Sequence, residues 1–426
     1  MLRIYNNFSI QSCLILLITV AVPLPSEALT LDQAIDRALK SDLERDVVEQ
    51  KLQAWKQKAK RTGQWDNPTF SVSGASDQAT NDRGKEVQSV EISQRFPVTD
   101  RISQQRIISR LEWKQAQAEL REYDRNLINT VKRTYSSLVF KNKILTFYNR
   151  QIDRLNTIIE MGERFLDRGE LSRLEWNMMQ MRRDKIKKHR DRVRQNLIEE
   201  RGKLKTVLNV PSDRNLKVSA TPIELKQKTQ QTVDTEVRLT RPDLQKRQFA
   251  LEQVQTELKR EQSRAWDDWE VSMGYDREET PDGNEENTVN LGLSIPFPLW
   301  NQNNAMRAFK KQMIDVAERS VVALQRRIDQ NVHTLKNKLS IQKQTFQRYT
   351  DTILPRAQRQ EKLSRQGFER GRIKASEFLR MSAQLFDARR AYYREFQDLN
   401  ELYIQYEHIT GHAKHLKTDF LKGQSQ

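Results

Sequence analysis

Two kinds of hydrophobic pattern alternate along this chain. In four short runs every second residue is apolar, as Val289, Leu291 and Leu293 illustrate, and this predicts β-strands with one apolar face. Between the runs, apolar residues recur at intervals of three and four, which predicts long helices that pack through narrow coiled-coil-like seams. The predicted strands lie at about 69–76, 87–96, 269–275 and 288–297.

The pattern of the first half predicts a helix, a β-hairpin, a long helix, a turn and a second helix. Thr30 is the expected N-cap of a helix that ends near Lys60. Pro97 closes the hairpin, because proline cannot donate a ladder hydrogen bond. Residues 101–161 contain no Pro or Gly and predict about 90 Å of helix at 1.5 Å per residue. A turn around Gly169 leads into a helix that returns to about residue 209.

The second half repeats the first. Equivalent positions lie 201 residues apart as far as the strands and 202 apart at the later turn, and a nearly constant offset indicates an internal duplication. The pairs are Leu43 and Leu244, Trp65 and Trp266, Phe96 and Phe297, and Gly169 and Gly371. Pro355 lies inside the long second-repeat helix and predicts a kink or interruption there. The expected organisation is a first repeat at 29–210, a linker at 211–240, a second repeat at 241–411 and a polar tail at 412–426.

Residues 1–28 have the organisation of a secretory signal peptide. Arg3 supplies a positive start, an apolar run extends from Cys13 to Val22, and Ser26-Glu27-Ala28 fits a cleavage site between small residues. A buried N-terminal helix or a membrane anchor is the alternative, but the run is too short to span a bilayer. Cys13 is the only cysteine, so we expect no disulfide and no thiolate metal site in the mature chain.

The composition limits the possible functions further. Charged residues make up 31% of the 426 residues and hydrophobic residues 36%, which suits long helices better than thick globular cores. The net charge of +17 would suggest a nucleic-acid partner in a cytosolic protein, but the predicted export argues against one. The sequence contains no nucleophile–base set and no phosphate loop, so we expect neither an enzyme nor a cofactor.

The predicted strands fit a membrane. Their length suits tilted bilayer-spanning strands, and aromatic residues such as Trp65, Phe96 and Trp300 lie at their ends. The alternative is a small soluble sandwich with these aromatic residues in its core. Four strands cannot close a membrane barrel alone, whereas three copies would supply twelve and leave room for a channel. Asp276 to Asn287 is rich in carboxylates and is expected to be an extracellular loop.

Five sequence features together resemble the TolC-like outer-membrane efflux proteins. They are Leu-Thr-Leu-Asp-Gln-Ala at 29–34, Arg241-Pro242-Asp243-Leu244, Ile-Pro-Phe-Pro-Leu-Trp-Asn at 295–301, Ile353-Leu354-Pro355 and the turn at Gly371. The segment at 295–301 is most similar to the branch that serves heavy-metal (CzcC- and CusC-like) RND exporters. The resemblance covers nearly the whole chain after the predicted signal peptide.

The resemblance implies an outer-membrane homotrimer. In that family three chains form a twelve-stranded β-barrel in the outer membrane and a long α-barrel in the periplasm. The predicted fold is therefore mainly α with a small β part. The resemblance also implies a periplasmic membrane-fusion adaptor that docks at Arg168-Gly169 and Arg370-Gly371, and an inner-membrane pump that supplies the energy. The protein would then be a duct without enzymatic activity.

The resemblance also suggests positions for a gate and a corner. Glu175 and Glu377 match the acidic residues that ring the pore in the family, but Arg380 replaces the next acidic residue and could pair with Glu377. The alternative for both glutamates is solvated helix surface. The corner between barrel and helices is expected at Phe96, Pro97, Pro296, Phe297 and Pro298.

Three of the five histidines form a weak candidate metal site. His408, His412 and His415 are spaced so that they could share a helix face and bind zinc, copper or nickel. A frayed polar tail is the alternative for this segment.

The predicted function is an outer-membrane duct of a tripartite RND efflux system that passes heavy-metal cations from the periplasm to the exterior. The alternatives are the same fold in drug efflux or type I protein secretion, and a secreted coiled-coil structural protein without a pore.

Overall fold

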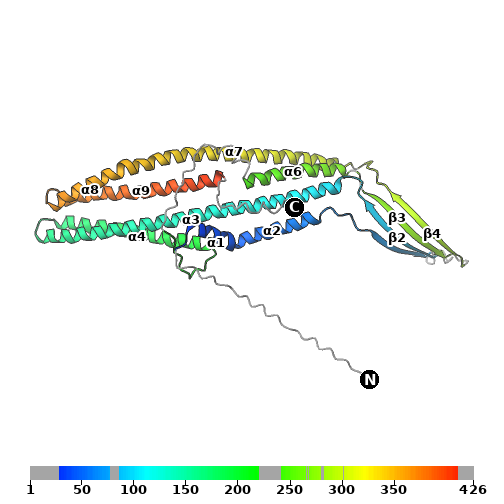
Figure 1. The fold of residues 1–426 in the computed structure, drawn as a ribbon, viewed down its shortest axis with the longest axis horizontal. Coiled ribbons are helices and arrows are strands. Elements are labelled where there is room, and N and C mark those ends of the chain that lie inside the picture. Colours follow the sequence, from blue (N-terminus) through cyan, green and yellow to red (C-terminus); the bar gives the residue numbers. More distant parts are fainter. Residues whose placement is uncertain are drawn as a thin grey trace, which may run out of the picture.

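A computed structural model of the chain describes residues 28–76, 86–219, 241–264, 266, 268–279, 283–300 and 302–410. The predicted signal peptide up to residue 27, most of the predicted linker and the predicted polar tail lie outside the described residues. The molecule is elongated, with long helices along its length and a β-sheet at one end (Figure 1).

Both halves of the chain contain a helical segment, a β-hairpin, a long helical segment, a turn and a returning helix, which confirms the predicted mainly α architecture of tandem repeats. The first repeat contains α1 (Leu31–Ser41), α2 (Leu43–Arg61), β1 (Thr69–Ser76), β2 (Glu86–Phe96), α3 (Arg101–Asp167) and α4 (Arg173–Val207). The second contains α6 (Pro242–Ser263), β3 (Trp269–Glu279), β4 (Glu285–Ser294), α7 (Asn304–Arg348), the π-helix η1 (Tyr349–Ile353), α8 (Leu354–Glu369) and α9 (Ala375–Thr410).

The first predicted helix is two helices. Thr30 caps α1 as expected, because its hydroxyl accepts from the Gln33 backbone and Gln33 bonds back in a capping box. The helix then breaks at Asp42, whose backbone is extended and whose carboxylate accepts the Arg45 N–H at 2.7 Å. The prediction of one helix to Lys60 was therefore wrong at Asp42, where a capping side chain competes with the helix interior.

The four strands form one antiparallel sheet in the order β1-β2-β3-β4. The two predicted hairpins are present, and β2 also pairs with β3 from Glu86 opposite Glu279 to Phe96 opposite Trp269. The predicted bounds of the loop, Asp276 to Asn287, are wrong at both ends, because Arg277 pairs with Asn287 inside the ladder. The fourth strand also ends at Ser294 rather than at residue 297, since Pro296 and Pro298 cannot continue a ladder.

A π-helical turn lies directly before Pro355. The chain stays helical from α7 through η1 into α8, so Pro355 interrupts the α-helical hydrogen bonding without breaking the helix. A π-turn accommodates one extra residue in an α-helix. The offset between the repeats rises from 201 to 202 between Phe297 and Arg370. We infer that the extra residue of the second repeat is accommodated in this turn.

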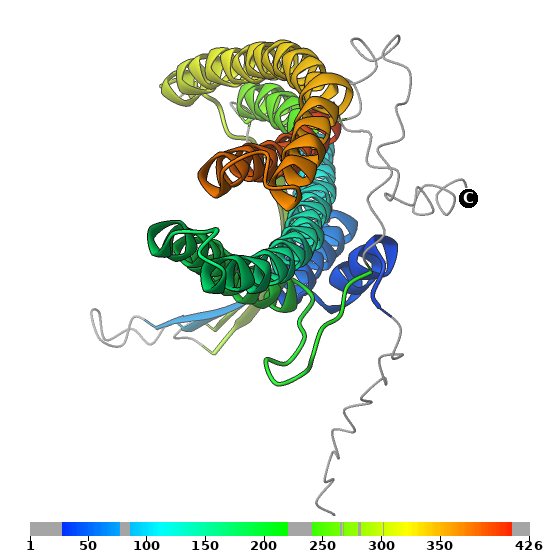
Figure 2. The same cartoon turned by 90° about the vertical axis from the view of Figure 1, so that its left-hand side faces the viewer.

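The helices form a curved layer that is one helix thick. Near the sheet, α2 packs on α3, α3 on α6, and α6 on α7. Near the opposite end, α4 packs on α3, α3 on α9, and α9 on α7 and α8. Viewed along its length, the layer of helices is strongly curved (Figure 2). The helices α2 and α4 lie at one edge of the layer, and α7 and α8 lie at the other.

The largest buried cluster packs α1 against α3 and the end of α4. Ile35 from α1, Leu138 from α3 and Leu204 from α4 are all completely buried in it. Tyr135 lies in the same cluster, and its hydroxyl donates to the backbone oxygens of Leu29, at 2.9 Å, and Ser219, at 3.3 Å. Leu29 and Ser219 are also joined by a backbone hydrogen bond of 2.9 Å.

We expect Tyr135→Phe to destabilise the α1 region, because it removes the buried hydroxyl that donates to the Leu29 and Ser219 carbonyl oxygens, at a cost of about 1 kcal/mol. Hydrogen exchange should show faster exchange of the amides in α1. Tyr123→Phe is the matched control, because its hydroxyl bonds carboxylates of Asp42 and Glu44 that water can reach. Equal exchange in wild type and Tyr135→Phe would contradict the prediction.

Candidate channel surfaces

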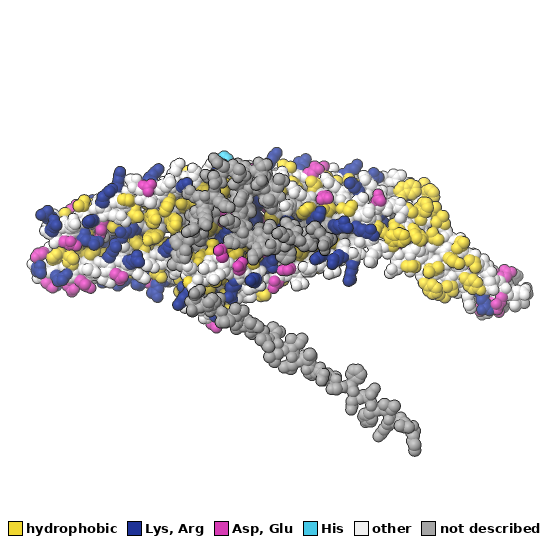
Figure 3. Space-filling model, viewed as in Figure 1, with side chains coloured by type: hydrophobic (Ala, Val, Ile, Leu, Met, Phe, Trp, Pro, Cys, Tyr) yellow, Lys and Arg dark blue, Asp and Glu magenta, His cyan; other side chains and the backbone are white. Residues whose placement is uncertain are grey.

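One face of the sheet is apolar across all four strands. The register aligns Phe70, Ile92, Met273 and Leu291 in one row of adjacent residues. A second row contains Val72, Val90, Tyr275 and Val289. All eight side chains are exposed, and Leu291 is 79% exposed. Hydrophobic side chains accordingly cover the sheet end of the molecule (Figure 3).

The opposite face of the sheet is polar or small. One row contains Ser71, Glu91, Gly274 and Asn290, and the next contains Ser73, Ser89, Asp276 and Thr288. Asn290 donates a hydrogen bond to Asp276 across the strands. A sheet with one apolar and one polar face separates an apolar medium from water, as the wall of a membrane channel does.

The end of the sheet away from the helices is acidic. Glu278 pairs with Glu286, and Glu279 lies between Glu86 and Glu285. Like charges directly opposite one another are unfavourable, and Arg277 offsets part of the repulsion because it forms an ion pair with Glu285. The carboxylates of the predicted loop therefore lie largely on strands, around the end of the sheet.

Equivalent aromatic pairs mark the two corners between strands and helices. Trp65 contacts Phe96 edge-on with ring centroids 5.8 Å apart, and Trp266 contacts Phe297 in the same way at 6.3 Å. The prolines predicted for the corners, Pro97, Pro296 and Pro298, lie directly after the strands, and all three are partly buried. At the second corner, Asn303 has a left-handed backbone and donates to the carboxylate of the buried Glu261 at 2.7 Å.

The two helical turns at the other end have the same geometry. Gly169 and Gly371 adopt positive φ angles of 74° and 66°, which favour glycine. Each glycine donates its backbone N–H to the residue three positions earlier, at 3.0 and 2.9 Å. Arg168 and Arg370 precede these glycines and are exposed. The side chains predicted to dock an adaptor therefore lie at the end of the molecule, where a partner can reach them.

The two turns pack against each other through an aromatic cluster. Phe165 meets Phe368 edge-on at 5.7 Å, and Phe368 stacks on Phe378 at 5.0 Å. Met179 is completely buried in the same cluster, where it lies against Gly162. A Cβ atom at position 162 would meet the Met179 sulfur at 2.9 Å, so a larger residue here would displace the buried Met179 side chain. The two turns therefore form one packed unit.

The two predicted gate glutamates have different surroundings. The Glu175 carboxylate accepts hydrogen bonds from the Ser172 hydroxyl, at 2.9 Å, and from the Ser172 backbone N–H, at 3.3 Å, as part of a capping box. The equivalent cap position before α9 is Lys374, which has no acceptor to cap a helix. Glu377 is exposed and forms no ion pair with Arg380 within the described part of the chain. Its carboxylate is therefore not held by a cap.

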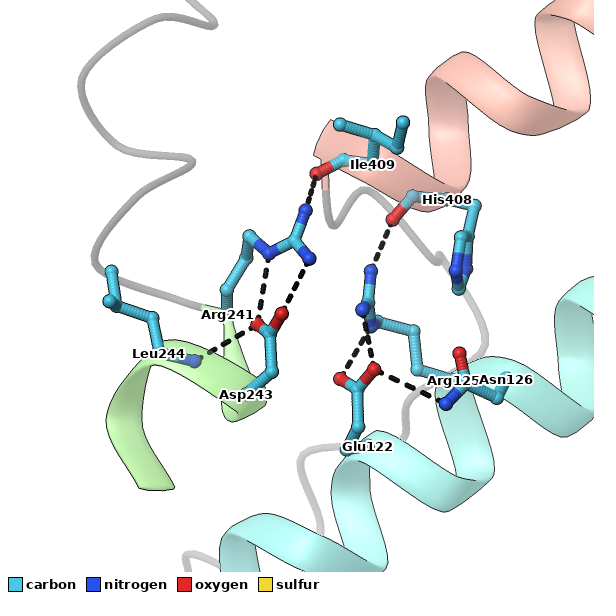
Figure 4. A network of polar contacts seen from close by, with 8 residues as sticks. All are labelled: Glu122, Arg125, Asn126, Arg241, Asp243, Leu244, His408 and Ile409. Carbon is cyan, nitrogen blue, oxygen red and sulfur yellow. Dashed lines mark hydrogen bonds and ion pairs between the residues drawn. The ribbon is translucent and has the colours of Figure 1, made fainter. Parts of the chain in front are cut away.

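A buried arginine of α3 caps the C-terminal end of α9. Arg125 is only 4% exposed, and it forms a two-pronged ion pair with Glu122 and donates to the backbone oxygen of His408 (Figure 4). The carbonyl groups of the last helical turn lack partners within the helix, so a buried arginine there stabilises the helix end. The network connects the end of the second repeat to the first.

A second arginine makes the equivalent contact from α6. Arg241 pairs with Asp243 at 2.7 and 3.0 Å and donates to the backbone oxygen of Ile409 at 2.7 Å (Figure 4). Asp243 also accepts from the Leu244 N–H at 2.9 Å, and Leu244 is almost completely buried between α6 and α7. These contacts give the segment 241–244 a structural role. The sequence identified Arg241 as a family feature but contained nothing that singled out Arg125.

The surroundings of His408 do not favour a metal cation. Burial, together with the charges of Arg125 and Arg241, lowers the pKa of His408 to about 4, and the same two positive charges disfavour a metal cation beside its ring. His412 and His415 lie outside the described residues. Among the described residues, no group of three or more His, Cys, Asp and Glu side chains is placed to hold a metal ion. None of the described helices combines the length and apolar character needed to cross a bilayer.

Comparisons with known proteins agree with these features. Residues 235–411 match the protein family described as outer membrane efflux protein. A stretch of 132 residues is 28% identical to the cobalt-zinc-cadmium resistance protein CzcC of Cupriavidus metallidurans. That alignment covers 31% of this chain and 31% of the relative, so it spans about a third of the relative's length.

The fold is similar to those of solved outer-membrane proteins. The outer-membrane channel OprN matches with a TM-score of 0.75 at 13% identity, over 89% of each chain. CusC matches with a TM-score of 0.65 at 13% identity, over 89% of this chain and 90% of the other. These matches confirm the predicted fold, and the family match confirms the predicted outer-membrane location. Residues 235–411 thus match the outer membrane efflux protein family, and the chain as a whole has the fold of outer-membrane channels.

Proposed function

We propose that three copies of this chain form the outer-membrane duct of a tripartite efflux system. The observation that carries the proposal is the four-stranded sheet, which has two fully apolar rows on one face and small or polar residues opposite them on the other. Such a sheet fits a bilayer only when its outer strands are paired, because lipid offers no hydrogen bonds to a sheet edge. Three copies would pair β1 of each chain with β4 of the next and form a twelve-stranded barrel.

The helical layer supports the same assembly. Its edge helices expose apolar side chains that the described residues of one chain leave uncovered. Leu174, Met178 and Met181 are exposed on α4 at one edge, and Phe309, Val316 and Leu363 are exposed on α7 and α8 at the other. The two edges differ, so copies would join head to tail around an axis, and such a contact closes into a ring. Sheet and helices then close together around one passage.

We propose heavy-metal cations as the cargo, with drugs or secreted proteins as the alternatives. The support is the similarity to CzcC, a cobalt-zinc-cadmium resistance protein, together with the corner at residues 295–301. A periplasmic adaptor at the Arg168 and Arg370 turns and an inner-membrane pump complete the proposed system. The chain itself would act as a passive channel rather than as an enzyme.

Deletion of the gene tests the proposed cargo. We expect sensitivity to cobalt, zinc and cadmium to rise by about tenfold or more in cells that depend on this system, because ions that the intact duct would pass to the exterior would accumulate in the periplasm. Growth at graded metal and drug concentrations is the measurement, and restoration by the wild-type gene is the control. Normal metal tolerance together with drug hypersensitivity would exclude metal cations and favour drug efflux.

The membrane face of the sheet is testable with two adjacent substitutions. Leu291→Arg places a charge on the apolar face, where arginine costs about 2–4 kcal/mol at the bilayer midplane. We expect it to reduce the heat-modifiable trimer in outer-membrane fractions. Asn290→Arg is the matched control, since it lies on the polar face beside Asp276 and should assemble normally. Normal assembly of both variants would rule out lipid contact at the apolar face.

The difference between the two glutamates predicts unequal effects on ion selectivity. In planar bilayers, Glu377→Gln should reduce the preference for cations by about twofold or more, because this carboxylate is exposed and not held by a cap. Glu175→Gln should change it less, since glutamine preserves the capping box and Glu175 is engaged by Ser172. Unchanged selectivity in Glu377→Gln would exclude Glu377 from the pore.

A further inference from the structure

A cavity of about 430 Å³ between α3 and α9 is lined by cations. Lys143, Arg150 and Arg154 line it from α3, and Arg389 lines it from α9. Phe147 and Tyr393 add aromatic rings. No acidic residue is part of it. The cavity lies in the helical part of the molecule, away from the strands.

Some basic residues of α3 form ion pairs, but among the described residues the four cations of the cavity do not. Lys132 pairs with Glu407 at 2.7 Å, and Lys141 pairs with Glu200 at 2.8 Å. Within the described part of the chain, none of the four cations lies within 4.0 Å of a carboxylate. The cavity is therefore a local excess of positive charge, whereas Lys132 and Lys141 elsewhere on α3 are neutralised by carboxylates.

A neighbouring cavity provides an internal comparison. It is also lined by α3 and α9, with Glu200 contributed by α4, and it has a volume of about 560 Å³. Its cations, Arg133 and Lys141, are balanced by Glu200 and Glu401, with Asp398 also in the lining. The helix pair thus balances charge in one cavity and leaves it unbalanced in the other.

The environment of Arg389 shows the effect of this imbalance. Burial is the main influence that lowers the pKa of Arg389, and the charge of Arg154 lowers it further. Glu361 acts in the opposite direction, but its carboxylate is engaged by Arg365 in an ion pair. A partly buried guanidinium beside a like charge is unfavourable unless an anion accompanies it.

We propose that this cavity binds a small multivalent oxyanion, whose carboxylate or phosphate oxygens accept hydrogen bonds from Arg389, Arg154, Arg150 and Lys143. Guanidinium groups present several donors that match such oxygens, and charge-assisted hydrogen bonds of this kind are stronger than neutral ones. The volume lies in the range of small-molecule sites. The ring of Phe147 or Tyr393 would contact the less polar part of the ligand. The site goes beyond the proposed efflux function and does not depend on it.

Calorimetric titration of the full chain, purified as its oligomer in detergent, tests the proposal. The probes are citrate for a polycarboxylate and pyrophosphate for a phosphate ligand, with acetate as the monovalent comparison. We expect one site per chain for citrate or pyrophosphate, weaker binding at higher salt because charges are screened, and no measurable binding of acetate. The probe that binds more tightly identifies the preferred type of oxygen.

The double variant Arg154→Gln with Arg389→Gln should weaken binding by about tenfold or more, because two charge-assisted hydrogen bonds are lost. Arg390→Gln is the matched control, since Arg390 is adjacent in sequence, exposed, paired with Asp387 at 3.6 Å and outside the cavity lining. It should bind like wild type. Equal binding by the double variant and wild type would overturn the proposal, and so would the absence of saturable binding of both multivalent probes.

Thermal unfolding separates loss of binding from loss of folding. Without an anion, the double variant should unfold at the same temperature as wild type or higher, because the repulsion between Arg154 and Arg389 is removed. Citrate or pyrophosphate should raise the unfolding temperature of wild type and Arg390→Gln, since a ligand that binds the folded state stabilises it. An equal rise in the double variant would also contradict a site at these arginines.

Discussion

The architecture depends on the pairing of β2 with β3. These strands belong to different repeats, and their ladder extends over the full length of both strands, from Glu86 opposite Glu279 to Phe96 opposite Trp269. Because side chains alternate between faces, a shift of one residue would exchange the apolar and polar sides of one hairpin. The observed register instead continues the apolar rows of both hairpins, such as Phe70 to Leu291. One ladder thus joins two copies of an ancestral unit into a single two-faced sheet.

The same join determines how the helices are arranged. Each hairpin connects two helices, so pairing the hairpins side by side places α3 next to α6 and leaves α2 and α7 at the outer edges. The layer remains one helix thick, and its narrow seams require little apolar surface, which agrees with a chain of low hydrophobic content. The far turns meet through Phe165, Phe368 and Phe378. The two repeats are therefore fixed to each other at both ends.

The structural differences between the two repeats arise from one additional residue and from replacements of single side chains. A single extra position in the second repeat is accommodated as the π-turn before Pro355 and leaves the turn at Gly371 equivalent to the one at Gly169. The second repeat has Lys374 at the position of Ser172, so it lacks the capping box that engages Glu175 in the first repeat. Arg125 and Arg241 both donate hydrogen bonds to backbone oxygens in the last turn of α9, although they come from different repeats. Duplication supplied a symmetric scaffold, and local changes gave the equivalent positions different chemical properties.

The sequence by itself determined the elements, the duplication and the family resemblance, because hydrophobic periodicity, glycine turns and prolines act over short distances along the chain. It located the strands, the long helices and the turns at Gly169 and Gly371, and it missed the break at Asp42, where a local cap overrides the helical pattern. Only the tertiary structure decided which cations have partners. Lys132 and Arg389 look alike in the sequence, but packing gives one a carboxylate and leaves the other beside Arg154, because the neighbours of a side chain on a long helix come from elements more than 200 residues away.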